Sequence, residues 1–350
     1  VTSETTFTAE EQNGNVDVIF TFDASALEGT TTVVFETLYT EGKEVAVHAD
    51  LRDAGQTVYL PKIRTHAQDG INEIDHTEAL EKATIIDTVT YTNLLPGKEY
   101  TVTGTLMDKE TGEAVLIDGK PITASTTFTA ETAEGSVDIV FEFDASAIAG
   151  TTVVAFESME YKGIEVAVHA DIEDENQTVY IPDVHTTATA TDTEDHVTGA
   201  NEEVTITDEV ALTGLKVDNE YTIKGVLMDQ TTGKELLVDE KQIVSEETFV
   251  ADKADMTITL TYKLDASKLA GITTVVFETL YTEGKEVGRH HEIDDEGQTV
   301  YIPEIHTTAA DQKTGINHTE SEEQATIVDT VLYSHLLPGK EYTVKGTLMN

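Results

Sequence analysis

The sequence predicts an all-β protein of tandem immunoglobulin-like antiparallel β-sandwich domains arranged as an extended rod. Short runs rich in β-branched and aromatic residues recur along the chain, and several alternate between apolar and polar residues. Turn signals such as Leu95-Pro96-Gly97 and Asp118-Gly119 separate these runs. The whole pattern then begins again, because Gln56, Gln177 and Gln298 are each 121 residues apart. A repeat of this length is typical of an array of whole domains.

The strands of one such domain can be followed in the middle of the chain. We expect strands at 137–143, 151–156, 166–169 and 177–181, because each run combines high β-propensity with flanking turn residues. The segment beginning at Asp144 predicts one short helical turn, and nothing longer is indicated as helix. Short strands at this spacing favour two packed antiparallel sheets.

Domain boundaries are predicted where each glutamine-containing strand ends on a proline. A segment containing threonine follows at once after Pro61, Pro182 and Pro303. Linkers this short do not allow free hinging, so a semi-rigid rod is favoured over beads on a string. The predicted parts are the later part of a repeat domain at 1–61, complete domains at 62–182 and 183–303, and the early part of a further repeat domain at 304–350.

The two incomplete end parts have two explanations. The chain is cut from a longer array, which we favour, or the end of one molecule completes the start of the next by strand complementation. Between them the two parts lack only the equivalent of residues 109–121.

The net charge and the absence of cysteine limit which partners and which crosslinks are expected. The chain has 21 basic and 67 acidic residues and a net charge of −46, so nucleic acid and anionic lipid are not expected partners. The acidic residues are interleaved with apolar ones, which indicates a folded acidic protein. Cysteine is absent. Three interpretations follow: a cytoplasmic protein, an uncrosslinked one, or one crosslinked by chemistry other than disulfides. No signal peptide, membrane span or lipidation motif is visible.

Five chemically active residue types keep the step of 121 residues while many neighbours differ. They are a hydroxyl, two carboxyls, an imidazole and a carboxamide, and this histidine column and this glutamine column are each the only one found in all three copies. The columns are Thr65, Thr186 and Thr307; Asp87, Asp208 and Asp329; Glu36, Glu157 and Glu278; His48, His169 and His290; and Gln56, Gln177 and Gln298.

These groups could form a covalent bond between the hydroxyl and the carboxamide. A hydroxyl attacks a carbonyl when a nearby imidazole accepts its proton, so Thr65 would attack Gln177 with His169 as base and ammonia as leaving group. Asp87 and Glu157 are expected on neighbouring strands, where two packed acids cannot both ionise. The protonated one would donate to the amide oxygen and polarise it. The product is an ester between two side chains.

The same residues allow other interpretations. Each residue type alone also has an ordinary structural role in strands. A Lys–Asn isopeptide bond would need a recurring lysine, but Lys62 becomes Asp183 and Glu304. The chain carries no zinc pattern and no phosphate-binding loop, so neither metal nor cofactor is predicted. Calcium is not favoured either, because the acidic residues before Gln177 lack the spacing of a calcium loop; these are Asp171, Glu173, Asp174 and Glu175.

The motifs also carry a family resemblance. Val-Val-Phe-Glu and Val-Ala-Phe-Glu, the spacing His-x7-Gln-Thr-Val, the opening Ile-His-Thr-Thr-Ala and residues 95–107 resemble the Thr–Gln ester-bond (VaFE-type) domains of Gram-positive surface adhesins and stalks. The resemblance covers essentially the whole chain. It implies an immunoglobulin-like fold, a self-formed ester between the first and last strands, and an extracellular, cell-wall-anchored location. By position the family roles fall on Thr65, Asp87, Glu157, His169 and Gln177, and on Thr186, Asp208, Glu278, His290 and Gln298.

Two departures from the pattern affect the assignment. The first opening reads Arg64-Thr65-His66, where the other two read His-Thr-Thr. Only the first threonine of each His-Thr-Thr opening has a counterpart in the first opening, so it is the better candidate for the reactive residue. The third histidine is doubled as His290-His291, and only the repeat step selects His290. Five residues belong to incomplete sites: Glu36, His48, Gln56, Thr307 and Asp329.

The sequence therefore predicts a structural cell-surface stalk in which each domain is locked by one ester. It would act once on itself and not as a turnover enzyme, and its expected partners are the neighbouring repeat domains. Three alternatives stay open: a turnover esterase using the same residues, a module that binds a carbohydrate or protein ligand of the host, with the adhesive region outside this sequence, and a self-polymerising fibre subunit with esters between molecules.

Overall fold

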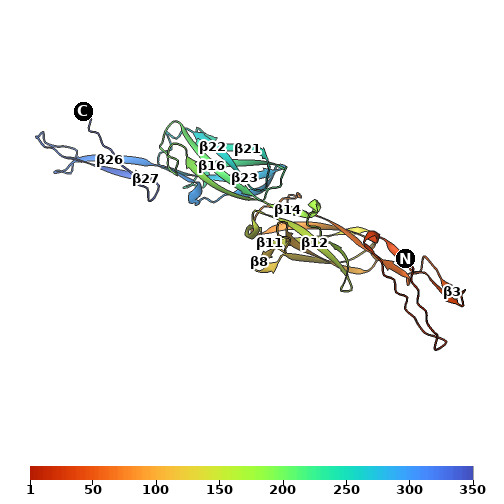
Figure 1. Ribbon diagram of the computed structural model, residues 1–350. Coiled ribbons are helices and arrows are strands. Elements are labelled where there is room, and N and C mark those ends of the chain that lie inside the picture. The colour runs from red at the N-terminus through yellow and green to blue at the C-terminus, as the bar shows by residue number, and fades with distance from the viewer. Residues whose placement is uncertain (350) are drawn as a thin grey trace.

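The protein forms an elongated row of β-domains, with its two termini toward opposite ends of the row (Figure 1). The structure is a computed structural model that describes residues 1–349. Two sandwich units occupy the middle of the row, and a smaller hairpin-containing part lies at each end. The predicted all-β architecture of tandem antiparallel sandwiches is confirmed.

The first complete unit packs a sheet of five strands against a sheet of three. The larger sheet has the order β10–β7–β12–β13, with β14 pairing the beginning of β12, and the smaller has the order β11–β6–β5. Its larger-sheet strands are β7 (Glu99–Asp108), β10 (Thr123–Thr129), β12 (Thr151–Tyr161), β13 (Ile164–His169) and β14 (Thr178–Ile181). Its smaller-sheet strands are β5 (Lys62–Asp69), β6 (Ala83–Thr92) and β11 (Gly135–Phe143), and a short hairpin joins β8 (Leu116–Ile117) to β9 (Lys120–Pro121).

The second complete unit repeats this arrangement. Its smaller sheet has the order β15–β16–β22, and in its larger sheet β17 and β23 are central. The smaller-sheet strands are β15 (Asp183–Ala190), β16 (Val204–Thr213) and β22 (Met256–Leu264). The remaining strands are β17 (Glu220–Asp229), β18 (Lys234–Glu235), β19 (Leu237–Val238), β20 (Lys241–Gln242), β21 (Val244–Val250), β23 (Ile272–Thr282), β24 (Lys285–His290) and β25 (Thr299–Ile302).

Each unit has its own core between its two sheets. Along β6 buried residues alternate with more exposed ones, as expected for a strand with one face inward. The glycine in the middle of β7 is required by close packing, since a Cβ on Gly104 would lie 2.5 Å from the ring of Phe141. The core of the first unit includes Ile85, Val89 and Leu106.

One predicted strand begins later than expected. Gln177 was expected to open the last strand, but it ends the short 3₁₀ turn η3 (Glu175–Gln177), and β14 starts at Thr178. The cause is Asp174, whose side chain accepts a hydrogen bond from the Asn176 amide and so caps the turn. The predicted helical turn after Asp144 is confirmed as the 3₁₀ turn η2 (Ala145–Ile148). The second unit has the turn η4 (Glu296–Gln298) at the position of η3.

The two complete units touch through a polar joint. His76 is 1% exposed. Its Nε2 lies 2.6 Å from the Tyr221 hydroxyl of the second unit, and its Nδ1 lies 2.7 Å from Asp75. Lys216 of the second unit donates to Asp75 at 2.6 Å. Buried hydrogen bonds between consecutive units restrict bending at this joint.

The end parts are hairpins with exposed apolar residues. At the N-terminal end β1 (Thr31–Val33) pairs with β4 (Thr57–Tyr59), and β2 (Glu36–Thr40) pairs with β3 (Lys43–His48), after the turn η1 (Ser25–Leu27). At the C-terminal end β26 (Glu304–Asp311) pairs with β27 (Ile327–Ser334). Among residues 1–349, no helix is long and apolar enough to span a membrane.

Candidate functional site

In the first unit the predicted threonine and glutamine lie side by side. Thr65 is on β5, and Gln177 closes η3 immediately before β14. The Gln177 Nε2 donates to Thr65 Oγ1 at 2.7 Å and to Glu157 Oε2 at 2.5 Å. Gln177 and Glu157 are at most 1% exposed, and Thr65 is 7% exposed. The predicted pair is therefore held in contact and largely shielded from water.

The first and last strands of the unit do not pair within one sheet. β5 belongs to the smaller sheet and β14 to the larger one, and the two strands contact each other at the edge of the sandwich. A bond between Thr65 and Gln177 would therefore join the two sheets as well as the two ends of the unit.

The second unit builds the same contacts. Gln298 Nε2 donates to Thr186 Oγ1, and it donates to Glu278 Oε2 at 2.5 Å. The Thr186 hydroxyl lies 3.4 Å from the same Glu278 oxygen. Equivalent strands, β15 and β23, supply Thr186 and Glu278.

A buried pair of acids completes each site. Asp87 on β6 is fully buried, and burial together with the neighbouring Asp87 charge raises the pKa of Glu157 to about 10. Burial also raises the pKa of Asp87, against the influence of the nearby Glu157 and Thr65 side chains, which lower it. Two carboxyls in one dry site cannot both be charged, so Glu157 carries a proton at neutral pH. The pKa values of Asp208 and Glu278 are raised in the same way by burial.

The protonated acid supplies a donor to a site with several unsatisfied buried oxygens. Gln177 Oε1, Glu157 Oε1 and both carboxyl oxygens of Asp87 are buried without a donor from any N–H or hydroxyl of the described residues. A proton on Glu157 supplies one donor, which is the group that an amide oxygen needs in order to be polarised.

The predicted base lies beside the pair but does not bond to the threonine. His169 is on β13, directly opposite Glu157 in the register of β12 and β13. Its Nε2 lies 2.9 Å from Asp174 Oδ2, and its Nδ1 lies 3.3 Å from Arg64 Nη1. The hydrogen bonds of the described residues include none between His169 and Thr65, so the predicted proton transfer needs a movement of the ring or of the hydroxyl.

Sequence reasoning missed the partner of this histidine. Asp174 was considered only as a calcium ligand, yet it keeps the step of 121 residues as Asp53, Asp174 and Asp295. The same pairing is formed by His48 with Asp53, at 2.8 Å. Burial raises the pKa of Asp174, but hydrogen bonds from His169 and the Asn176 amide outweigh it and lower that pKa. The retained step was the signal that could have revealed this residue.

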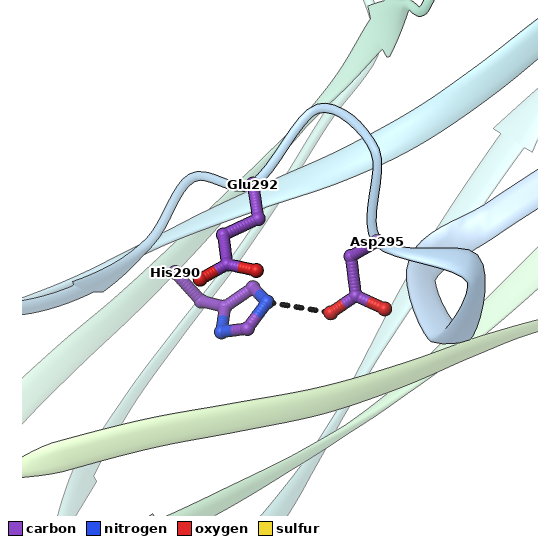
Figure 2. Close-up of side chains that lie close together, drawn as sticks. All are labelled: His290, Glu292 and Asp295. Atoms are coloured by element: carbon purple, nitrogen blue, oxygen red, sulfur yellow. Dashed lines mark hydrogen bonds and ion pairs between the residues drawn. The ribbon is translucent and has the colours of Figure 1, made fainter.

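The second unit offers the one group of this chain's described residues in which three side chains could hold a metal ion. The ligating atoms of His290, Glu292 and Asp295 lie within 4.8 Å of one another. In Figure 2 the Glu292 carboxylate lies next to the His290 ring, and a dashed line joins the ring to Asp295. That line is the 2.8 Å contact of His290 Nε2 with Asp295. The Asp295 carboxylate therefore already occupies the ring nitrogen Nε2 of His290.

His291, the second histidine of the doubled pair, lies outside the site. Its Nε2 contacts the Thr279 hydroxyl at 2.9 Å, and its ring stacks on Phe277. His290, in contrast, is opposite Glu278 in the register of β23 and β24, as His169 is opposite Glu157.

One buried aromatic residue distinguishes the two sites. Phe141 of the first unit is replaced by Tyr262 in the second. The Tyr262 hydroxyl is buried without a hydrogen-bond partner among residues 1–349. Burial raises the pKa of Tyr262, and the neighbouring carboxyls of Asp208 and Glu278 raise it further, so this hydroxyl keeps its proton beside the acid pair.

Each end part holds a fraction of a site. Gln56 Nε2 donates to Glu36 Oε2 at 2.5 Å, as in the complete units. In β26 and β27, Thr307 is opposite Val331, and Asp329 is opposite Ala309. The equivalent residues of the first unit have the same register. The two fractions lie at opposite ends of the molecule (Figure 1).

Comparison with known proteins places the chain in a family. The family described as "T-Q ester bond containing domain" matches residues 1–60, 61–181, 182–302 and 303–350, which together are the whole chain. The chain belongs to this family. The first three matched segments of the T-Q ester bond family end at residues 60, 181 and 302, each one residue before the predicted domain ends at 61, 182 and 303. No curated protein matches the chain.

Several solved structures resemble parts of this T-Q ester bond protein. A bacterial adhesin from Mobiluncus mulieris, described as containing intramolecular disulfide, isopeptide and ester bond cross-links, is 14% identical, with 79% of this chain and 99% of the adhesin covered and a TM-score of 0.31. A putative β-galactosidase from Bacteroides fragilis is 12% identical over 64% of this chain and 34% of its own, with a TM-score of 0.25. Red sea bream transglutaminase is 13% identical over 68% and 31%, with a TM-score of 0.23. Because these TM-scores are low, we draw no conclusion about activity from the similar structures.

Proposed function

We propose that each complete unit forms one intramolecular ester between its threonine and its glutamine. The observation that carries the proposal is the 2.7 Å contact between Thr65 Oγ1 and Gln177 Nε2, buried beside an acid pair that shares a proton. The membership of the T-Q ester bond family supports the same reaction.

The reaction balances with groups that the unit itself supplies. Thr65 Oγ1 bonds to the Gln177 Cδ, and the bond from Cδ to Nε2 breaks. His169 takes the hydroxyl proton and returns it to the departing nitrogen, which leaves as ammonia. A half-turn of the carboxamide places Oε1 against Glu157, whose proton then polarises the carbonyl. The catalytic roles proposed for the second unit belong to His290, Asp208 and Glu278.

Each site would react once, because its product remains attached. The ester joins residues 65 and 177, close to the two ends of the unit, so a pull along the row would pass through a covalent bond. Burial of Gln177 keeps water from the ester and slows its hydrolysis. These properties suit a load-bearing stalk of an adhesin-type protein at the cell surface, anchored to a Gram-positive wall, in which neighbouring repeats are the partners.

An intact-mass measurement tests the proposal. Each ester expels one ammonia, so the purified chain should weigh less than its sequence by two ammonia masses. The motivation is the pairing of Thr65 with Gln177 and of Thr186 with Gln298. A mass equal to that of the sequence would remove the proposal, and peptide mapping would assign each loss to its unit.

A bond between molecules is the second candidate, and one observation favours it. The two end parts already hold matching fractions of a site, with Gln56 bound to Glu36 and with Asp329 opposite Ala309. If molecules complement one another, Thr307 of one chain would esterify Gln56 of the next. We expect no such bond in the purified chain, because these hairpins expose unpaired strand edges that favour non-specific association.

Denaturing electrophoresis without reductant checks this expectation. We expect a single band that Thr307→Ala does not change. A ladder of covalent multimers that disappears in Thr307→Ala but persists in Thr308→Ala would contradict it and identify a self-polymerising fibre subunit.

A further inference from the structure

The joint between the two complete units is closed around the ring of Tyr180, which belongs to the first unit. His76 of the same unit stacks on this ring, with the ring centroids 5.2 Å apart. Lys216 of the second unit reaches over the ring, with its Nζ 5.6 Å from the centroid, and donates to Asp75 at 2.6 Å. The Tyr221 hydroxyl of the second unit lies 2.6 Å from His76 Nε2. Side chains of both units therefore share one polar cluster.

A second group of contacts closes the joint at β24. Arg289 Nε of the second unit lies 3.7 Å from Glu78 Oε1 of the first. Asn72 of the first unit donates from its Nδ2 to the backbone carbonyl of Glu286 at 3.2 Å. In both groups an acid of the first unit faces a base of the second, so the two surfaces are electrostatically complementary.

The two backbones also approach each other closely at this joint. Gly214 of the second unit has a φ of +70°, and a Cβ on it would lie 2.8 Å from the carbonyl carbon of Gly150. A backbone carbonyl cannot turn aside as the end of a flexible side chain can, so this approach requires glycine. The same repeat position holds Asn93 in the first unit and His335 in the last part of the chain.

The other repeats keep the backbone arrangement of this joint but not its side chains. The tyrosine hydroxyl accepts a hydrogen bond from a backbone amide at the equivalent place in three repeats, at 2.8 to 2.9 Å. The loop that carries Asp75 bonds to the Tyr180 amide at 2.8 Å, and the loop that carries His196 bonds to the Tyr301 amide at 2.9 Å. The side chains that meet across the joint differ at the same repeat positions: Asp75, His76 and Glu78 become His196, Val197 and Gly199, Lys216 becomes Leu95 and Leu337, and Arg289 becomes Val168.

Two end surfaces can therefore be defined at this joint. The acidic end surface of the first unit consists of Asp75, His76 and Glu78. The basic end surface of the second unit consists of Lys216, Tyr221 and Arg289.

We propose that the end surfaces of the repeats are matched to specific neighbours, and that the acidic end surface docks onto the basic one to make the two complete units a single rigid body. A valine in place of His76 offers no polar group to the Tyr221 hydroxyl, and a leucine in place of Lys216 leaves Asp75 without its base. A mismatched neighbour would thus leave buried polar groups unpaired, which is how specificity between similar partners is commonly achieved. The inference does not depend on the proposed ester.

Matched joints would solve two problems of a repeat array. Repeats with nearly the same fold are prone to misassembly during folding, and a joint that fits one neighbour only disfavours wrong pairings. Neighbouring domains otherwise move relative to each other by default. A docked joint fixes the direction of the second unit, so the first two complete units would act as one stiff segment of the row.

The experiment measures the distance between the two units in the full chain. Because the chain has no cysteine, spin labels attach only at introduced ones. Thr90→Cys and Ala211→Cys place labels at the same exposed position of β6 and β16. Pulsed electron paramagnetic resonance should give one narrow distance distribution. His76→Val with Lys216→Leu introduces the residues that other repeats carry, and the distribution should become about twofold broader as the units move independently.

Two tyrosine substitutions supply a matched control. Tyr100→Phe and Tyr221→Phe each remove a hydroxyl that accepts a backbone hydrogen bond, but only the second hydroxyl also contacts a neighbouring complete unit. Tyr221→Phe should therefore broaden the distribution and Tyr100→Phe should not. Lys216→Leu alone changes a side chain that is 33% exposed, and it serves if the double variant fails to fold.

Three outcomes would overturn the proposal. The first is a broad distribution in the labelled chain without joint substitutions. The second is an unchanged width in both Lys216→Leu and Tyr221→Phe. The third is equal broadening in Tyr100→Phe and Tyr221→Phe, because that would indicate lost packing within a unit and not lost docking between units.

Discussion

Replacing His169 by alanine is expected to abolish the proposed ester of the first unit and to leave that of the second unit intact. Removal of a positioned base slows a reaction by about 10²–10⁴-fold. No other imidazole lies opposite Glu157 in the register of β12 and β13, so no replacement base is at hand. Intact mass should show a loss of one ammonia instead of two, and peptide mapping should place the unreacted pair at Thr65 and Gln177.

The matched control is His66→Ala. His66 is next to the reactive threonine but exposed on the opposite face of β5, so both esters should form in this variant. Asp174→Asn provides a graded test of the pairing at 2.9 Å, because it keeps the shape of the side chain and removes its charge. If His169→Ala still loses two ammonia molecules, the imidazole is not the base.

Much of this fold could be predicted because the alternation of apolar and polar residues within strands and the repeat step of 121 residues indicate the same architecture. The alternation along β6 and β11 follows directly from one face pointing into the core. The step of 121 residues selected His290 over His291, and the register opposite Glu278 shows why only His290 lies at the site. The predicted proximity of a threonine near the start of a unit to a glutamine near its end agrees with the contact at 2.7 Å.

The remaining features depend on geometry that residue types do not determine. Gln177 lies in a turn and not in a strand, because Asp174 caps that turn while its other carboxylate oxygen faces His169. The contact of Arg64 with the His169 imidazole depends on the rotamer of a long side chain, which has no sequence signal. The proton on Glu157 depends on how completely both acids are buried, and only the packed structure gives that information.

Loss of the hydroxyl in Thr65→Ala is expected to lower the thermal stability of the first unit strongly. The proposed ester would close a loop between residues 112 positions apart, and in the chain-entropy model closing a loop of this size stabilises by about 4–5 kcal/mol. For a unit of this length that difference lowers the melting temperature by roughly 15–20 °C. Calorimetry of the full chain should show two transitions in this variant, with only the first unit shifted to lower temperature.

Two threonine substitutions separate the crosslink from ordinary packing. Thr65→Ser keeps a hydroxyl at the same position, so the ester should form and the transition should stay near that of the unsubstituted chain. Thr90→Ala removes an exposed threonine from β6 in the same sheet, and such surface changes usually alter stability by less than about 0.5 kcal/mol. The uncrosslinked first unit still has its buried core between two sheets, so it should unfold cooperatively at the lower temperature. A Thr65→Ala chain that keeps its original melting temperature while lacking one ammonia loss would show that the ester adds no equilibrium stability, and would leave resistance to force as its remaining role.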